Sequence, residues 1–98
     1  MTRVVHVRKS SFDTYIGRAF LEFEESVWHN PFHIEIGCGR KCVIAKYEAY
    51  IRSRPDLIAR LCELKGKTLG CWCHPKACHG DTLVKLVKEF YGEDNPEV

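Results

Sequence analysis

Apolar side chains recur every three to four positions through the second half of the chain, a spacing typical of helices that bury one face. The pattern predicts helices over residues 40–52 and 79–91, and a further helix that begins at Pro55 and ends before Gly66. The positions expected to face the core are Val43, Ile44, Tyr47, Tyr50, Ile51, Leu57, Ile58, Leu61, Cys62, Leu83, Val84, Val87, Phe90 and Tyr91.

Two segments have the alternation and the β-branched content of strands, at residues 3–8 (RVVHVR) and 67–73 (KTLGCWC). In the second of these, alternation places Cys71 and Cys73 on the same face. Between residues 9 and 39 the pattern is weaker, with only short extended pieces. The order of strand, irregular pieces, two helices, strand and helix predicts a small, compact, Rossmann-like α/β domain, with a mainly parallel sheet and flanking helices.

Length and composition favour a single domain. The chain has 98 residues, of which 45% are hydrophobic and 29% are charged, and this balance is typical of a folded domain. We expect one α/β domain over residues 1–92 and a flexible acidic tail over residues 93–98. The net charge of +2 gives no general nucleic-acid or membrane signature, although a local basic patch stays open.

The cysteines and the N-terminal sequence bear on where the protein acts. No long apolar run indicates a leader or a membrane span, so we expect a cytoplasmic protein without a membrane partner. In that compartment six cysteines indicate thiols, metal ligands or core packing rather than a disulfide framework. Cys38, Cys42 and Cys62 have the plain interpretation of ordinary thiols, with Cys62 in the core.

The segment GCWCHPKACHGD at residues 70–81 carries the chemistry of this sequence, because it leaves a predicted strand and enters a predicted helix. The amides and the dipole at such a helix start attract anions and lower the pKa of a thiol. Cys78, His79 and Asp81 are therefore candidate catalytic residues. We expect the His79 imidazole to assist proton transfer and, when protonated, to favour the Cys78 thiolate. Gly80 would let a ligand approach the backbone. Asp81 either stabilises the first helical turn or orients His79 or a sugar hydroxyl.

Two other interpretations of the same segment stay open. Cys71, Cys73, Cys78 and His79 are three thiols and one imidazole, an accepted ligand set for a structural zinc ion, although their spacing is unusual. Alternatively, the thiols are small residues that pack well between a strand and a helix.

A second group of candidates lies upstream of the first predicted helix. Arg18 suits contacts with phosphate or carboxylate, Trp28 can stack on a base, and Asn30 adds an amide. Arg40, at the start of the first helix, is a further candidate anion contact, and Cys73 completes the predicted ligand-binding set. The alternative is a surface arginine beside core aromatic residues.

Four segments together resemble the domain of unknown function 4326 family, small proteins met in bacteria and their phages. They are YIGR, SVWHNPF, GRKCVIAKYEAYI and LKGKTLGCWCHPKACHGDTLVKLV, and the likeness runs from about Arg8 to Val87. The last motif of the family, G-C-W-C-x-P-x-x-C-H-G-D-x-L, is matched at residues 70–83. A shorter version of this signature is similar to domain of unknown function 488, which lacks the pair formed by Cys71 and Cys73. The resemblance implies no particular activity.

These observations lead to three hypotheses of function. The first is a domain that binds a nucleotide-like or other phosphorylated small molecule at a site centred on Cys78, His79 and the helix amides. The second is a zinc-stabilised module that recognises protein or nucleic acid. The third is a cysteine-dependent enzyme that acts on nucleotides or nucleic acid.

Overall fold

The computed structural model describes residues 2–92, and these form an α/β domain around a three-stranded sheet. The strands are β1 (Arg3–His6), β2 (Thr14–Tyr15) and β3 (Thr68–Cys71), and β3 lies in the middle with both neighbours parallel to it. The predicted fold class and the parallel sheet are therefore confirmed. The Rossmann-like description is not confirmed, because residues 2–92 contribute only these three strands.

The helices begin and end close to where the apolar spacing predicts them. They are α1 (Arg40–Arg52), α2 (Pro55–Arg60), which continues as the 3₁₀ turn η1 (Leu61–Leu64), and α3 (His79–Tyr91). Gly92 follows α3 with a φ of +72°, a conformation that glycine adopts without strain. None of the helices in residues 2–92 combines the length and the apolar character that a bilayer crossing requires.

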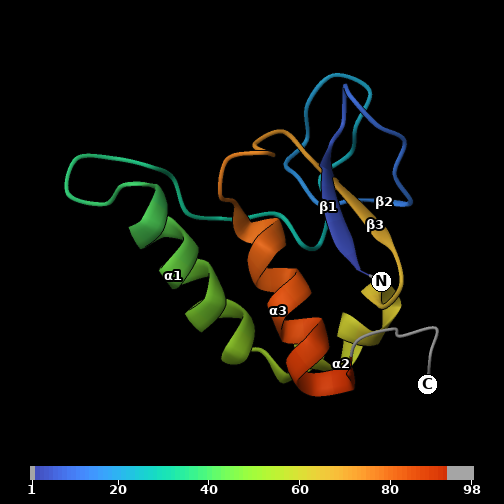
Figure 1. Ribbon diagram of the computed structural model, residues 1–98. Coiled ribbons are helices and arrows are strands. Elements are labelled where there is room, and N and C mark those ends of the chain that lie inside the picture. Colours follow the sequence, from blue (N-terminus) through green and yellow to red (C-terminus); the bar gives the residue numbers. More distant parts are fainter. Residues whose placement is uncertain (1, 93–98) are drawn as a thin grey trace.

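The helix α3 lies between the sheet and α1 (Figure 1). Its apolar face is fully buried at Leu83, Leu86 and Val87. On the outer side, Arg52 of α1 bonds Glu89 of α3 with two charged hydrogen bonds of 2.7 Å each. The β3–α3 junction is therefore anchored by a helix that is itself packed on both sides.

Two of the predicted core positions are wrong. Cys62 is exposed in η1, because this turn narrows to a 3₁₀ helix and its apolar stripe no longer follows the α-helical spacing. Phe90 is 44% exposed near the end of α3, and the Arg52 guanidinium at the end of α1 lies over its ring. The predicted strands are shorter than expected at their carboxyl ends, and the predicted tail at 93–98 lies outside the described residues.

The segment from 16 to 39 is held by isolated contacts instead of regular structure. Phe20 pairs with Phe23 and Glu35 pairs with Cys38 in single antiparallel bridges. Cys38 also forms a disulfide with Cys42 in the first turn of α1, which corrects the expectation that both are thiols. The two cysteines are four residues apart, and their disulfide joins the loop to the helix that follows it.

Candidate functional site

A pocket of about 670 Å³ opens between the irregular segment, the start of α1 and the β3–α3 junction. Its lining combines apolar and aromatic side chains with two arginines, two histidines and three cysteines, and no carboxylate of the described part of the chain contributes to it. Its residues are Tyr15, Gly17, Arg18, Ala19, Phe20, Asn30, Phe32, His33, Ile34, Arg40, Val43, Ile44, Cys71, Trp72, Cys73, Ala77, Cys78 and His79.

Three thiols lie in series at the base of this pocket. The Sγ atoms of Cys71 and Cys78 are 3.2 Å apart, and Cys71 in turn interacts with Cys73. Cys71 ends β3, Cys78 is the N-cap of α3, and both are buried, whereas Cys73 is half-buried. The strand-to-helix connection thus adds Cys78 to the pair, Cys71 and Cys73, that alternation over residues 67–73 predicted on one face.

The Cys78 thiol has a lowered pKa because it accepts a hydrogen bond from Cys71, and the backbone N–H of Gly80 contributes to the same effect against the opposing cost of burial. The Cys71 pKa is affected in both directions. Its bond with Cys73 lowers it, but its bond with Cys78 and its burial raise it more. The Cys73 pKa is raised, first by its bond with Cys71 and then by burial. Together these contacts make Cys78 the most readily ionised of the three thiols.

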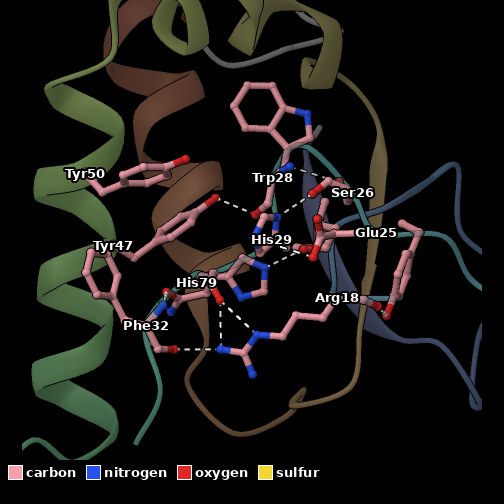
Figure 2. A network of polar contacts seen from close by, with 12 residues as sticks. Arg18, Glu25, Ser26, Trp28, His29, Phe32, Tyr47, Tyr50 and His79 are labelled. Carbon is pink, nitrogen blue, oxygen red and sulfur yellow. Dashed lines mark hydrogen bonds and ion pairs between the residues drawn. The ribbon is translucent and has the colours of Figure 1, made fainter. Parts of the chain in front are cut away.

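The His79 imidazole is not placed to transfer a proton to or from Cys78, because it bonds elsewhere in the fold. Its Nε2 lies 2.7 Å from the carbonyl oxygen of Ile16, to which it donates, and its ring packs edge-on against Tyr47 at 5.0 Å (Figure 2). Burial is the main cause that lowers the His79 pKa. The imidazole is therefore neutral at neutral pH, which corrects the expectation that a protonated His79 stabilises the Cys78 thiolate.

Asp81 and Gly80 have structural roles. The Asp81 carboxylate accepts the backbone N–H of Cys78 at 3.0 Å, and the Cys78 side chain accepts the N–H of Asp81, so the two form a capping box. A Cβ at Gly80 would lie 2.8 Å from Val4 and 3.0 Å from Ile16. Gly80 therefore lets α3 approach the sheet, and neither residue lines the pocket.

Arg18 lies at the pocket wall in a fixed position. Its Nε and Nη2 atoms donate to the Asn30 carbonyl at 3.0 and 2.7 Å, and Nη2 also donates to the Phe32 carbonyl at 2.7 Å (Figure 2). The Asn30 side chain accepts the Phe32 N–H at 2.9 Å, which closes the turn around Pro31. The predicted candidates Arg18 and Asn30 are thus brought together, through the Asn30 backbone carbonyl.

Arg40, the first residue of α1, reaches across the pocket to the β3–α3 connection. Its Nη1 donates to the Ala77 carbonyl at 3.0 Å, and its guanidinium also favours the thiolate form of Cys73. The N-cap of α1 is Gly39, which has no side chain to cap the helix, and the first turn contains no acidic residue. The helix start beside Arg40 therefore has a positive potential that no carboxylate of the first turn balances.

Trp28 does not belong to the pocket. Only 2% of it is exposed, and its carbonyl oxygen accepts the Tyr47 hydroxyl at 2.8 Å (Figure 2). This placement leaves no ring face for a ligand to stack on. Trp72 lines the pocket instead, with its indole N–H donated to Tyr15 at 2.8 Å and its edge against Phe20.

The four-ligand zinc interpretation receives no support from the geometry. Within residues 2–92, no group of three or more histidine, cysteine, aspartate or glutamate side chains is arranged to hold a metal ion. The reason is visible at His79, because its Nε2 faces Ile16.

The structure brings six of the nine predicted catalytic and ligand-binding residues to one pocket, and it places Trp28, Gly80 and Asp81 outside. Sequence reasoning missed the apolar wall that α1 supplies through Val43 and Ile44. The sequence did contain an indication of it. The apolar positions of α1 cover more of the helix surface than one packing face requires, but the apolar spacing assigned all of them to the core.

The comparison of the sequence with protein families identifies the chain. The model of the family described as Domain of unknown function (DUF4326) matches residues 2–89. The chain belongs to this family. The likeness to domain of unknown function 488 stays a prediction.

Two viral proteins are similar to this DUF4326 member. Uncharacterized protein R718 of Acanthamoeba polyphaga mimivirus is 39% identical over 100 aligned positions, which cover 88% of this chain and 76% of the relative. An uncharacterized 12.4 kDa protein in the nrdA-td intergenic region of Enterobacteria phage T4 is 32% identical over 97 positions, which cover 96% of this chain and 84% of the relative. No solved structure matches the chain at a significant level.

Proposed function

We propose that this domain binds a nucleotide-like or other phosphorylated small molecule in the pocket between α1, the β3–α3 junction and the irregular segment. One observation carries the proposal: two arginines line the pocket, and among residues 2–92 no carboxylate lines it. Guanidinium groups match the geometry of phosphate oxygens, and an apolar setting strengthens their attraction for an anion.

Both arginines keep hydrogen-bond donors for a ligand. Within residues 2–92, Nη1 of Arg18 donates to no protein acceptor, while the other two nitrogens fix the side chain. Arg40 has five N–H groups and uses part of them for Ala77 and Cys73. Because both side chains are already positioned, a ligand that binds them loses little side-chain entropy.

The two helix starts at the pocket differ in what they offer an anion. At α3 the Gly80 N–H already bonds the Cys78 sulfur, and the Asp81 N–H is used in the capping box. At α1 no side chain caps the helix and its first turn carries Arg40. We therefore assign the phosphate to Arg18, Arg40 and the start of α1, and not to the α3 amides on which the sequence centred the site.

The apolar wall suits the remaining part of such a ligand. Phe32, Ile34, Val43 and Ile44 line one side of the pocket, and Trp72 lines the β3 side. A volume of about 670 Å³ falls within the range of pockets that hold drug-sized ligands. A planar base or a similar apolar group would bury its faces here, with its phosphate at the arginines.

The experiment that tests the proposal is titration calorimetry of the full chain with the common nucleoside 5′-monophosphates, the corresponding nucleosides and inorganic phosphate. We expect at least one nucleotide to bind more tightly than its nucleoside. Arg40→Gln should weaken that binding by about 10- to 100-fold, because hydrogen bonds to charged groups contribute about 1.5–3 kcal/mol.

The matched control is Arg60→Gln, which removes the same charge from an exposed arginine that pairs with Glu63 on α2 and η1. This variant should bind like the wild type. Equal losses in both variants, or no binding of any nucleotide or phosphate, would contradict the proposal.

A further inference from the structure

We propose that Cys78 and Cys71 form a redox-active dithiol that reduces hydroperoxides, with Cys78 as the attacking thiolate and Cys71 as the thiol that then forms a disulfide with it. This activity goes beyond ligand binding and does not depend on the bound nucleotide. It rests on the arrangement of the three sulfurs at the base of the pocket.

The two sulfur atoms are already close enough to react after a small movement. Their separation is 3.2 Å, and a disulfide bond is about 2.05 Å long, so the atoms must approach by little more than 1 Å. Cys71 ends a strand in the centre of the sheet, whereas Cys78 precedes α3 in extended conformation with a φ of −150°. The required movement therefore falls on the connection at 72–77, where no regular helix or strand forms.

The hydrogen bonds fix the order of the two steps. Cys78 accepts bonds from Cys71 and from the Gly80 N–H, which lower its pKa, so it is the more readily ionised of the two thiols and attacks first. Cys71 is held protonated mainly by its bond with Cys78, while Cys73 acts in the opposite direction. Once Cys78 is oxidised, its thiolate no longer retains the Cys71 proton, and the Cys73 bond continues to lower the Cys71 pKa. Attack by Cys78 thus prepares Cys71 for the second step.

The chemistry balances with one hydroperoxide as oxidant. The Cys78 thiolate attacks the terminal peroxide oxygen, the O–O bond breaks, and the products are a sulfenic acid and, after protonation, water or an alcohol. The Cys71 sulfur then attacks the Cys78 sulfur, the S–O bond breaks, and the Cys71 proton leaves with the hydroxyl as water. Two thiols are oxidised and one peroxide is reduced, and an external thiol reductant restores the dithiol.

Access to the pocket favours a small oxidant. Cys71 and Cys78 are only 1% and 3% exposed, and both line the base of the pocket. Hydrogen peroxide can reach such atoms, whereas a bulky disulfide substrate would need the pocket wall to open. The exposed Cys62 lies outside the pocket and supplies an internal reference for oxidation in bulk solvent.

The test uses the full chain treated with hydrogen peroxide at neutral pH, followed by thiol blocking, tryptic digestion and mass spectrometry. Cleavage after Lys76 separates Cys71 and Cys73 from Cys78, so the new disulfide links two peptides, and fragmentation shows which cysteine is joined. We expect a Cys71–Cys78 link that forms at least about tenfold faster than Cys62 is oxidised, and that a thiol reductant reverses.

Variants separate the roles of the sulfurs. Cys71→Ser should leave a sulfenic acid on Cys78 that dimedone traps in several-fold higher yield, and Cys73→Ser should keep the Cys71–Cys78 link but form it more slowly. Cys62→Ser is the control and should leave the rate unchanged. If Cys71→Ser does not fold, the proposal is tested by the wild-type rates alone, with formation of the Cys71–Cys78 link compared with oxidation of Cys62. A link through Cys73, oxidation of Cys78 without any link, or faster oxidation of Cys62 would overturn the proposal, whatever the calorimetry of nucleotides shows.

Discussion

The two long helices both begin at the pocket, and they begin in opposite ways. At the start of α3, the Asp81 carboxylate and the Cys78 sulfur satisfy backbone N–H groups within the chain. At the start of α1 the N-cap is Gly39, which has no side chain to do so, and the first residue is a positively charged arginine. One helix start therefore holds its negative charge internally, whereas the other has positive charge to offer a ligand.

The difference teaches that a helix N-terminus in a pocket is not in itself an anion site. What matters is whether the chain has already used the amides. In this domain the start of α3 lowers the pKa of the Cys78 thiol, whereas we propose the start of α1 as the phosphate site, so the two roles fall at separate places in the pocket.

The largest expected effect comes from a comparison of the glycines at the two helix starts. Gly80→Ala would place a Cβ 2.8 Å from Val4 and should destabilise the protein by about 1–3 kcal/mol, as overpacking of a core does. Gly39→Ala, at the N-cap of α1, meets no atom within 4 Å and should cost less, about 0.5–1 kcal/mol, because alanine is a poorer N-cap residue than glycine. Urea unfolding measures both. Equal losses would show that α3 does not need its close contact with the sheet.

The next effect concerns the capping box of α3. Asp81→Ala removes the acceptor for the Cys78 N–H and should lower stability by about 0.5–2 kcal/mol. It also removes a carboxylate that opposes the Cys78 thiolate, so the alkylation of Cys78 by iodoacetamide at neutral pH should not become slower. Thermal unfolding and peptide-resolved alkylation rates check the two parts. A stable variant with an unreactive Cys78 would contradict the role assigned to Asp81.

His79, the first residue of α3, predicts how the stability of the protein depends on pH. Burial lowers the His79 pKa in the folded protein below its value in the unfolded chain, so the unfolded chain takes up a proton first. The contribution of neutral His79 is thus fully present above about pH 6.5, the unperturbed value, and is lost as the pH falls towards the folded pKa. Urea unfolding between pH 8 and pH 5 should show a smaller acid loss in His79→Asn than in the wild type. The exposed His33→Asn is the control, and the same acid loss in both variants would remove His79 as the cause.

The smallest effect is expected at the uncapped start of α1. Lys41→Glu places an acidic residue in its first turn and should stabilise the free protein by about 0.3–1 kcal/mol through the helix dipole. If the same helix start attracts a phosphate, this variant should also bind the best nucleotide more weakly. The melting temperature should therefore rise while the affinity for the nucleotide falls. A variant in which both increase would show that the start of α1 is not part of the ligand site.

The sequence was sufficient for much of the fold because apolar spacing is a local property. The helix α1 occupies the predicted residues, α3 ends at Tyr91 before Gly92 as predicted, and β3 includes the predicted alternation of Leu69 and Cys71. Errors occur where the local pattern continues but the structure changes. Cys62 is exposed because a 3₁₀ turn replaces the expected α-helical turn.

The segment from 16 to 39 was beyond sequence reasoning, because its contacts join residues distant along the chain. Arg18 is fixed by the carbonyl oxygens at Asn30 and Phe32, and the buried Trp28 accepts the Tyr47 hydroxyl of α1 at its backbone carbonyl. Hydrogen bonds to backbone carbonyls cannot be inferred from residue identity. The sequence therefore could not distinguish the fixed Arg18 from a surface arginine, or the buried Trp28 from a tryptophan that stacks on a ligand.

By itself, the sequence determined the parallel α/β class, the main helices and a strand-to-helix junction that carries three thiols and a histidine. Only the tertiary structure decided their roles. His79 turns to the Ile16 carbonyl, Gly80 packs against Val4, and Arg40 crosses to Ala77. The physical reason is that periodic burial sets where elements form, whereas the direction in which a polar group points depends on partners that become neighbours only after folding.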